Sequence, residues 1–493
     1  MIQHNLIRFL LKPLAEMMQR FSEKTRERLF IAAGLAIFVM NFLYSGLVIQ
    51  WRYLYTYVIC CIFLGIMVLC SLSPDIKPVR LRGALLLPML GAGAFMLLSG
   101  LINNVEYMLE AMLILVAYPV LYICWGNMER EKVICRLIRI ARISGYVFLG
   151  ASFLLIQIRS RKYGGLFYNV NSCAFYLSLV CACLVAEILD RRKLDWRCAG
   201  DILLFGACMA MNFYTNSRTG MLAVYVFSAA GIVLYLITHT QKERLQCVVR
   251  GLCCVLVSVV MIHSLVYVFQ LRALFPIPYY EKESRTFYFT PAWQARLFPD
   301  EGNGDEIQAD TALLNGIFGL EDFNEVNEIK SDTEGKTLDS YSTGRVGIWK
   351  TYASDLNLFG HADIPPTIIK NSNGLDVEIH TTHMTILEIS YKSGLIAGVF
   401  YFMLNIVSGI LAIVYGLKNK ADRYALLPLL IILVFGVCSV LASTDGSFSY
   451  MSTLYYYFAL FPLITAKSQK EPVSAPADGQ RRNLSTGDLN RAQ

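Results

Sequence analysis

The sequence predicts an all-α membrane protein with about twelve transmembrane helices and a large extracytoplasmic loop between the ninth and tenth. Three observations support this prediction. Hydrophobic residues make up 55% of the 493 residues and charged residues only 16%, and the mean hydropathy is +0.48. Apolar runs long enough to cross a bilayer recur along the chain. The lysines and arginines behind the net charge of +7 lie between these runs, which is typical of a membrane protein.

The same composition excludes several classes of protein. An ordinary soluble enzyme contains about 25% charged residues, well above the share found in this chain. The 14 cysteines do not indicate a disulfide-bonded ectodomain, since they lie in apolar runs or beside basic loops and none falls between residues 255 and 437. The basic residues are spread over the loops, so a nucleic-acid partner is not expected.

The apolar runs define the predicted spans. A hydrocarbon core about 30 Å thick needs about 20 apolar residues to be crossed by a helix. Runs of this kind fall at residues 29–49, 53–72, 83–102, 108–126, 143–158, 167–188, 199–214, 220–238, 248–270, 394–416, 424–442 and 451–466. The fifth, seventh and twelfth runs are short, which leaves eleven to thirteen spans open. An even number places both termini on one side of the membrane.

The basic loops give the orientation. Lys and Arg are concentrated in alternate loops, and the positive-inside rule places these loops and both termini in the cytoplasm. Residues 1–28 lack the apolar core and cleavage site of a signal peptide. Their apolar residues repeat at helical spacing, which predicts a cytoplasmic amphipathic leader on the inner leaflet; a frayed basic leader is the alternative. Spans 1–9 then occupy residues 29–270 and spans 10–12 residues 394–466, and residues 467–493 form a polar, disordered cytoplasmic tail.

Residues 271–393 form the predicted extracytoplasmic loop. It is too long for a simple connection and holds about half of the 37 acidic residues. Its pattern becomes helical after residue 344, so we expect short helices that form a lid over the outer mouth of the bundle. His380 and His383 have the spacing of zinc ligands on a helix, but no third ligand is evident. The chain has no nucleotide-binding motif, and we expect neither a metal nor another cofactor.

Four groups of polar residues fall at one predicted depth, the outer edge of the bundle. They are Arg159, Arg161 and Lys162 with Asn169 and Asn171; Arg218 in a tight turn; Arg345 with Trp349; and His380 and His383 with Glu388. Each has a simpler interpretation when taken alone. Arginines at helix ends often extend to lipid headgroups, asparagines cap or pair helices, and a carboxyl in an apolar run is often protonated or wet. Together they predict a site for an anionic ligand whose lipid tail remains in the bilayer.

This set of side chains suits glycosyl transfer from a lipid diphosphate. The planar guanidinium of arginine binds phosphate oxygens through charge-assisted hydrogen bonds. A neutral histidine has a suitable pKa to take the proton of a hydroxyl acceptor as it attacks the anomeric carbon. No cluster of acidic residues accompanies the arginines, so the predicted reaction is independent of metal, with protein cations stabilising the leaving group.

Three segments resemble the O-antigen ligase and O-antigen polymerase superfamily of bacterial membrane glycosyltransferases. YNVNSCAFYLSL resembles the family's Asn-Pro-Asn stretch, with Val170 in place of Pro, and FYTNSRTGML is similar to its Ser-Arg-Gly/Thr turn. STGRVGIW, LFGH and HMTILEISYKSGLIAG resemble a Gly-Arg…Trp pattern, a Phe-Gly turn, and a His followed by Leu at +4 and Gly at +11. The match covers about residues 159–400. It departs from the family at Met384, commonly Asn, and the spacing to Gly394 favours His383 over His380 as the family's histidine.

The resemblance implies a GT-C-like architecture and an active site at the outer face. It implies that His383 is the base and that Arg218 and Arg345 contact an undecaprenyl diphosphate. Further contacts to the diphosphate or glycan are expected from Arg159, Arg161, Lys162, Asn169, Asn171, Trp349, His380 and Glu388. The implied partners are an undecaprenyl-diphosphate-linked glycan, a glycan or lipid-linked acceptor, membrane lipids and other polysaccharide-assembly proteins, in the bacterial cytoplasmic (inner) membrane.

Alternative functions remain open at the level of sequence. The family contains polymerases, which extend a chain of repeat units, and ligases, which move a finished glycan to another acceptor. We favour polymerase because no surface for a lipopolysaccharide core is recognisable. A lipid-linked oligosaccharide flippase or other transporter is a third possibility, although such proteins often show two related halves and this chain has no internal repeat. A non-catalytic assembly or anchoring protein is a fourth.

Overall fold

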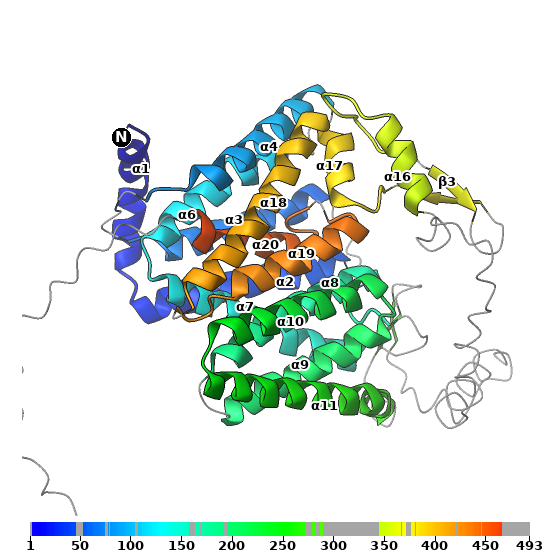
Figure 1. Ribbon diagram of the computed structural model, residues 1–493. Helices are drawn as coiled ribbons and strands as arrows, with labels where there is room; N and C mark the ends of the chain where they lie inside the picture. Colours follow the sequence, from blue (N-terminus) through cyan, green and yellow to red (C-terminus); the bar gives the residue numbers. More distant parts are fainter. Residues whose placement is uncertain are drawn as a thin grey trace, which may run out of the picture.

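The computed structural model is a bundle of α-helices with two small β-hairpins (Figure 1). It describes residues 2–45, 53–73, 77, 79–103, 107–156, 163–167, 169–191, 195–271, 279–281, 286–288, 345–365, 367–370, 376–379, 381–420, 422–444 and 446–465. The bundle helices are α1 (Ile2–Gln19), α2 (Glu23–Ser45), α3 (Tyr53–Cys70), α4 (Gly83–Ile102), α5 (Tyr107–Met112), η1 (Leu113–Ala117), α6 (Tyr118–Gly126), α7 (Arg130–Leu155), α8 (Val170–Asp190), α9 (Trp196–Tyr214), α10 (Arg218–Thr238), α11 (Gln241–Leu271), α18 (Leu395–Lys418), α19 (Leu427–Leu441) and α20 (Met451–Ile464).

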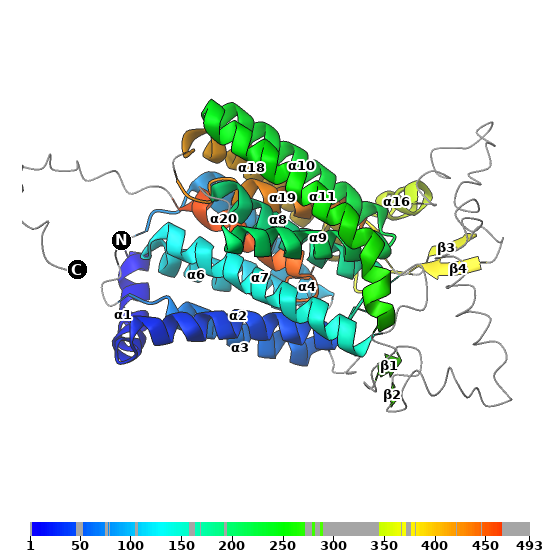
Figure 2. The same cartoon turned by 90° about the horizontal axis from the view of Figure 1, so that it is seen from below.

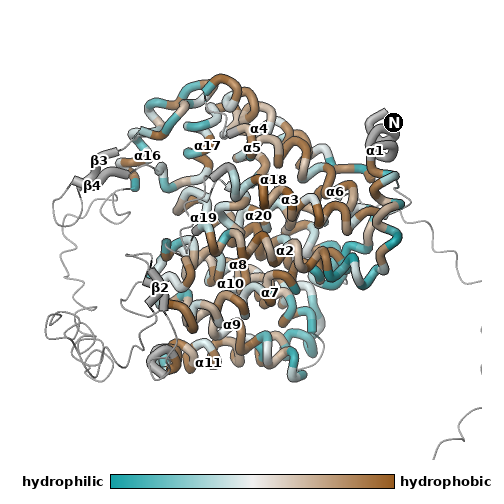
Figure 3. The backbone as a smooth tube through the Cα atoms, turned by 180° about the vertical axis from the view of Figure 1, so that it is seen from behind, coloured by the Kyte–Doolittle hydropathy of each residue, from teal (hydrophilic) through white to brown (hydrophobic). Residues whose placement is uncertain are grey.

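Each of the twelve predicted ranges overlaps one of these helices, the fourth being continuous through α5, the π-helix η1 and α6. Within the described residues, eight helices are long and apolar enough to cross a membrane, and α3, α19 and α20 are shorter apolar helices. Figure 3 shows the hydrophobic residues along the middle of the bundle and the hydrophilic residues mainly at its ends. The chain is therefore an all-α, multi-pass membrane protein.

Two helices form the centre of the bundle. Nearly all described side chains of α8 are buried, and those of α20 are buried throughout. α8 packs against α7, α9, α10, α19 and α20. Apolar side chains are stable against lipid as well as against protein, so the interior position of these two helices is set by packing and not by hydropathy alone. By contrast α11, at the edge of the bundle, leaves most of its apolar side chains exposed.

Several predicted boundaries were wrong. The fifth span was predicted to begin at residue 143, but α7 begins at Arg130, and α11 begins at Gln241 instead of residue 248. These helices continue through basic residues whose charges are accommodated by packing: the buried Arg136 guanidinium lies 5.5 Å from the ring centroid of Phe30. Hydropathy detects the apolar part of a helix and misses such extensions. The helix of the first span, α2, begins at Glu23, within the predicted leader of residues 1–28.

The helix α1 and the loop helix α16 (Arg345–Ser354) lie at opposite ends of the bundle (Figure 2). In Figures 1 and 2, α1 crosses the end of the bundle instead of running along it. Ala15 on α1 is buried against Leu72 and Cys124. The helix α1 of the predicted leader and the described helix α16 of the long loop therefore lie at opposite ends of the bundle.

The described part of the long loop contains α16, a short helix α17 (Thr385–Ser393) that leads into α18, and two antiparallel hairpins. The hairpins pair β1 (Tyr279–Glu281) with β2 (Thr286–Tyr288) and β3 (Thr367–Lys370) with β4 (Asp376–Ile379). The expected helix after residue 344 is present. Most of the predicted lid, in residues 289–344, lies outside the described residues.

Candidate functional site

Two helices that cross the bundle begin side by side. Asn169 caps α8 by accepting a hydrogen bond from the backbone N–H of Asn171 at 2.8 Å, and Ser217 caps α10 by accepting one from Gly220 at 3.3 Å. The Ser217 hydroxyl also donates to Oδ1 of Asn171 at 2.8 Å, which joins the two caps. Because a helix N-terminus carries a positive partial charge, this junction favours an anion. Asn169, as the cap of α8, and Asn171, as the acceptor for Ser217, therefore hold this junction together.

The turn that precedes α10 has a tightly constrained backbone. Asn216 has φ +52°, in the left-handed region that Asn tolerates better than most residues. A Cβ added at Gly220 would lie 2.5 Å from Cβ of Ala174 on α8, so only glycine allows this approach of the two helices. The sequence Asn-Ser-Arg-Thr-Gly is thus explained by local geometry, with Arg218 left exposed at the first position of the helix.

Arg345, the first residue of α16, lies near Arg218. Burial and the positive charge of Arg218 both lower the pKa of Arg345. Neither guanidinium has a carboxylate or other hydrogen-bond partner among the described residues. Two unneutralised cations from separate segments, next to two helix N-termini, form an arrangement that an anion such as a diphosphate would stabilise.

His383 lies beside Arg345 in the turn before α17. Burial lowers the pKa of His383, the charge of Arg345 lowers it further, and the carboxylate of Glu388 opposes this change. The imidazole is therefore neutral at pH 7 and able to accept a proton. His383 has φ +53°, an uncommon backbone conformation for a residue with a side chain, and its N–H donates to Oγ1 of Thr381 at 3.3 Å.

Glu388, predicted as a substrate contact, is buried and its carboxylate is engaged within the protein. Oε2 accepts hydrogen bonds from the N–H of Thr382 at 3.2 Å and from the hydroxyls of Thr381 and Ser443. Oε1 pairs with Nζ of Lys392 at 2.8 Å. The carboxylate therefore organises the turn that carries His383.

α16 is seated on α17 by a small apolar cluster of Ile348, Tyr352, Leu387 and Tyr391. The rings of Tyr352 and Tyr391 meet edge to face with centroids 5.1 Å apart. Trp349 packs against this cluster one turn after Arg345, and its indole N–H is buried without a hydrogen-bond partner in the described part of the chain. A buried donor without a protein partner is uncommon, which makes this N–H a candidate for a contact with a ligand.

Gly360 and Gly394 allow two backbone segments, the turn around residue 360 and the junction of α17 with α18, to lie against each other. A Cβ at Gly394 (φ +91°) would lie 2.1 Å from the carbonyl oxygen of Leu358, and one at Gly360 (φ +81°) would lie 2.1 Å from that of Lys392. Leu395 N–H donates to the carbonyl oxygen of Asn357 at 2.8 Å. The Phe-Gly turn thus locks the α17–α18 junction, which positions α17 and the turn before it.

Sequence reasoning missed the segment between α19 and α20. Ser443 contacts Glu388, while Ser447 donates from its N–H and its hydroxyl to the carboxylate of Glu110, at 3.2 and 2.5 Å. Thr444 N–H donates to Oγ1 of Thr385, the first residue of α17, at 2.8 Å. A run of small polar residues between two apolar spans was the available signal. Glu110 precedes the π-helix η1, an element often found at functional positions.

Four predicted site residues lie outside the described residues: Arg159, Arg161, Lys162 and His380. Among the described residues, no group of three or more His, Cys, Asp or Glu side chains is arranged to hold a metal ion. His383 lies in a turn before α17 and not on a helix, so the helical zinc-ligand geometry considered for the pair does not apply to it.

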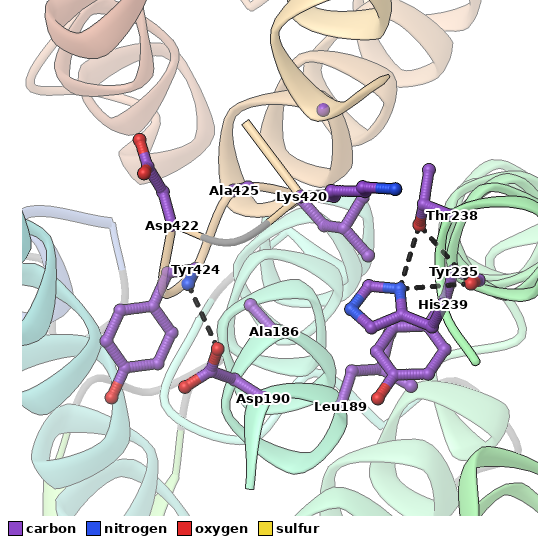
Figure 4. A pocket seen from close by; sticks show the side chains of 12 residues that line it. Ala186, Leu189, Asp190, Tyr235, Thr238, His239, Lys420, Asp422, Tyr424 and Ala425 are labelled. Carbon is purple, nitrogen blue, oxygen red and sulfur yellow. Dashed lines mark hydrogen bonds between the residues drawn. The ribbon is translucent and has the colours of Figure 1, made fainter. Parts of the chain in front are cut away.

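A small cavity of about 30 Å³ lies away from this cluster, where α8, α10 and α18 end (Figure 4). Two of its polar side chains already have partners: Asp190 accepts from Arg423 at 2.7 Å and from the N–H of Tyr424 at 3.3 Å, and His239 stacks on Tyr235. Arg218 is the first residue of α10, whereas the cavity is lined by Tyr235 and Thr238 in its last turn, so the two lie at opposite ends of that helix.

No protein-family model matches the chain, and no curated protein is significantly similar to it.

Proposed function

We propose that the protein is a membrane glycosyltransferase that polymerises undecaprenyl-diphosphate-linked oligosaccharide repeat units of a surface polysaccharide at the outer face of the bacterial cytoplasmic membrane. The proposal includes twelve spans with both termini in the cytoplasm. The observation that carries it is the cluster of Arg218, Arg345 and His383, in which two cations without acidic partners among the described residues lie beside a histidine of lowered pKa.

The two arginines bind the diphosphate. The N-termini of α8 and α10 add positive partial charge beside Arg218, and the indole N–H of Trp349 donates to a further oxygen of the diphosphate or glycan. As the glycosidic C–O bond to the diphosphate breaks, the leaving group takes the electron pair, and the guanidinium groups stabilise the charge that develops.

His383 acts as the general base. The acceptor hydroxyl attacks the anomeric carbon and gives its proton to the neutral imidazole. The products are the extended glycan and the protonated form of His383, with the polyprenyl diphosphate released. No step requires a metal, because the charge of the leaving group is balanced by protein cations.

A ligase that transfers a finished glycan to another acceptor uses the same chemistry, and the two activities differ only in the acceptor. A transporter for lipid-linked oligosaccharide is the candidate from another class. Transport is disfavoured because the unpaired cations gather at one end of the bundle, whereas transporters bind their substrates near the middle of the membrane.

Reconstitution tests the proposal. The purified protein in liposomes is supplied with an undecaprenyl-diphosphate oligosaccharide in the presence of EDTA, and glycan length is followed on gels. We expect a ladder of products; a single transfer onto a supplied acceptor identifies a ligase, and an unaltered oligosaccharide in wild type contradicts glycosyl transfer. His383→Ala should abolish the products at equal protein level. His263→Ala is the matched control, because His263 is exposed and its Nδ1 contacts only the carbonyl oxygen of Val259 in its own helix.

A further inference from the structure

The turn of residues 381–383 is hydrogen-bonded to a single carboxylate, that of Glu388. Glu388 is 4% exposed, and its Oε2 accepts from the backbone N–H of Thr382 at 3.2 Å and lies 3.2 Å from the Thr382 hydroxyl and 3.0 Å from that of Thr381. The Thr381 hydroxyl in turn accepts from the N–H of His383. The left-handed conformation of His383 is thus maintained by a hydrogen-bond network that converges on one carboxylate.

The same carboxylate connects the turn to the bundle. Ser443, two residues after the end of α19, donates to Oε2 of Glu388. Four residues later, Ser447 is bound by Glu110, so the segment between α19 and α20 is fixed from two sides. Lys392, one turn after Glu388 on α17, balances its charge through Oε1 at 2.8 Å. These contacts fix the position of the turn relative to α5, α17 and α19.

We propose that Glu388 is a positioning residue for the base, whose carboxylate holds residues 381–383 against Ser443 and thereby keeps His383 beside Arg345. The expected effect of Glu388 on the rate of transfer rests on the proposed function. Its effect on the structure of the turn does not. The role replaces the predicted one, in which Glu388 contacts the substrate, because its two oxygens are occupied by the protein's own donors.

Amide hydrogen exchange tests the structural part in the reconstituted protein, whatever reaction it catalyses. In Glu388→Gln, which keeps the size of the side chain, we expect exchange of peptides that cover residues 381–384 to accelerate at least tenfold. Ser443→Ala should accelerate it about threefold. Ser390→Ala is the matched control, since the Ser390 hydroxyl donates only within α17, to the carbonyl oxygen of Ile386 at 2.7 Å. Exchange in Ser443→Ala equal to that in Ser390→Ala would overturn the proposal.

The pH dependence of transfer tests the kinetic part. The negative charge of Glu388 raises the pKa of His383, so its removal lowers that pKa and moves the acid limb of the pH profile to lower pH. We expect kcat of Glu388→Gln to fall at least tenfold, with KM for the lipid-linked donor within twofold of wild type. A large rise in KM with an unchanged acid limb would assign Glu388 to substrate binding instead.

The two tests separate the proposals. If wild type performs no glycosyl transfer, the proposed function fails, while the exchange measurement still decides the role of Glu388. If Glu388→Gln does not fold, the comparison of Ser443→Ala with Ser390→Ala decides it.

Discussion

Arg218 and Arg345 each begin a helix, and their guanidinium groups lie close enough for the charge of Arg218 to lower the pKa of Arg345. Like charges at such a separation raise the energy of the protein unless an anion joins them. Neither side chain finds an acidic partner in the described residues. The protein thus keeps two cations together at the end of the bundle that carries α16, and the predictions below follow from this cluster and from the elements that position it.

The activity should depend on pH through His383. Burial and Arg345 lower its pKa below the ordinary value of 6.5, and the neutral imidazole is the active form, so kcat/KM should rise with pH along an acid limb whose midpoint lies below 6.5. Arg345→Gln removes a positive charge, which raises the pKa of His383 and moves this limb to higher pH. Arg345→Lys keeps the charge and should leave the limb in place. Initial rates over a range of pH check this, and a limb that stays fixed in Arg345→Gln contradicts it.

Arg218→Lys should raise KM for the lipid-linked donor. Lysine keeps the charge but not the planar pair of donors that binds two phosphate oxygens, and the loss of one charge-assisted hydrogen bond corresponds to about 1.5–3 kcal/mol, or about 10- to 150-fold in kcat/KM. The measurement is steady-state kinetics in liposomes. Arg197→Lys, on the exposed side of α9, is the control. Normal kinetics in Arg218→Lys would reduce Arg218 to a point charge.

Trp349→Phe tests whether the unpaired indole N–H serves a ligand. The substitution removes one donor and keeps most of the aromatic packing, so KM for the donor substrate should rise by about 2- to 13-fold, as expected for a hydrogen bond of about 0.5–1.5 kcal/mol, with little change in stability. Trp196→Phe, where the side chain is 78% exposed, is the control and should behave as wild type. Equal KM values in the two variants argue against a ligand contact at Trp349.

Gly394→Ala should destabilise the protein by more than about 2 kcal/mol, because alanine is strained at φ +91° and its Cβ would lie 2.1 Å from the carbonyl oxygen of Leu358. Thermal unfolding in detergent measures this. The control is Gly409→Ala within α18, where an added Cβ meets no atom within 4 Å and helix propensity predicts a stabilisation of up to about 1 kcal/mol. Similar melting temperatures for the two variants would show that the α17–α18 junction tolerates a different backbone.

An ion network stabilises the other end of the bundle. Arg191 pairs with the buried carboxylates of Glu187 at 2.9 Å and Asp201 at 2.8 Å. Arg191→Met leaves two buried acidic groups with fewer partners and should cost about 3–5 kcal/mol. The matched control is Lys12→Met, which breaks the exposed pair with Glu16 at 3.8 Å and should cost about 0–1 kcal/mol. The measurement is the free energy of unfolding in denaturant. An equal loss of stability in both variants would contradict a structural role of the network.

The fold class followed from the sequence because hydropathy is a local property of each segment. The ranges predicted for α4, α8 and α18 agree with the structure within about three residues, since their apolar runs are bounded by polar residues that also end the helices. α7 was predicted too short because Arg136 is buried against an aromatic ring supplied by a distant helix, α2. Such compensation depends on tertiary packing and leaves no signal in a hydropathy window.

For the candidate site too, some features could be predicted from the sequence and others required the tertiary structure. The types of residue at Arg218, Arg345 and His383, and their order along the chain, were evident from the sequence, because side-chain chemistry and spacing are local. Only the tertiary structure decided that Arg218 and Arg345 lie together, that Glu388 faces its own turn, and that Ser443 completes the network. These relationships depend on how α10, α16, α17 and α19 pack, and that packing is set by contacts between residues far apart in the sequence, such as Ile348 with Leu387.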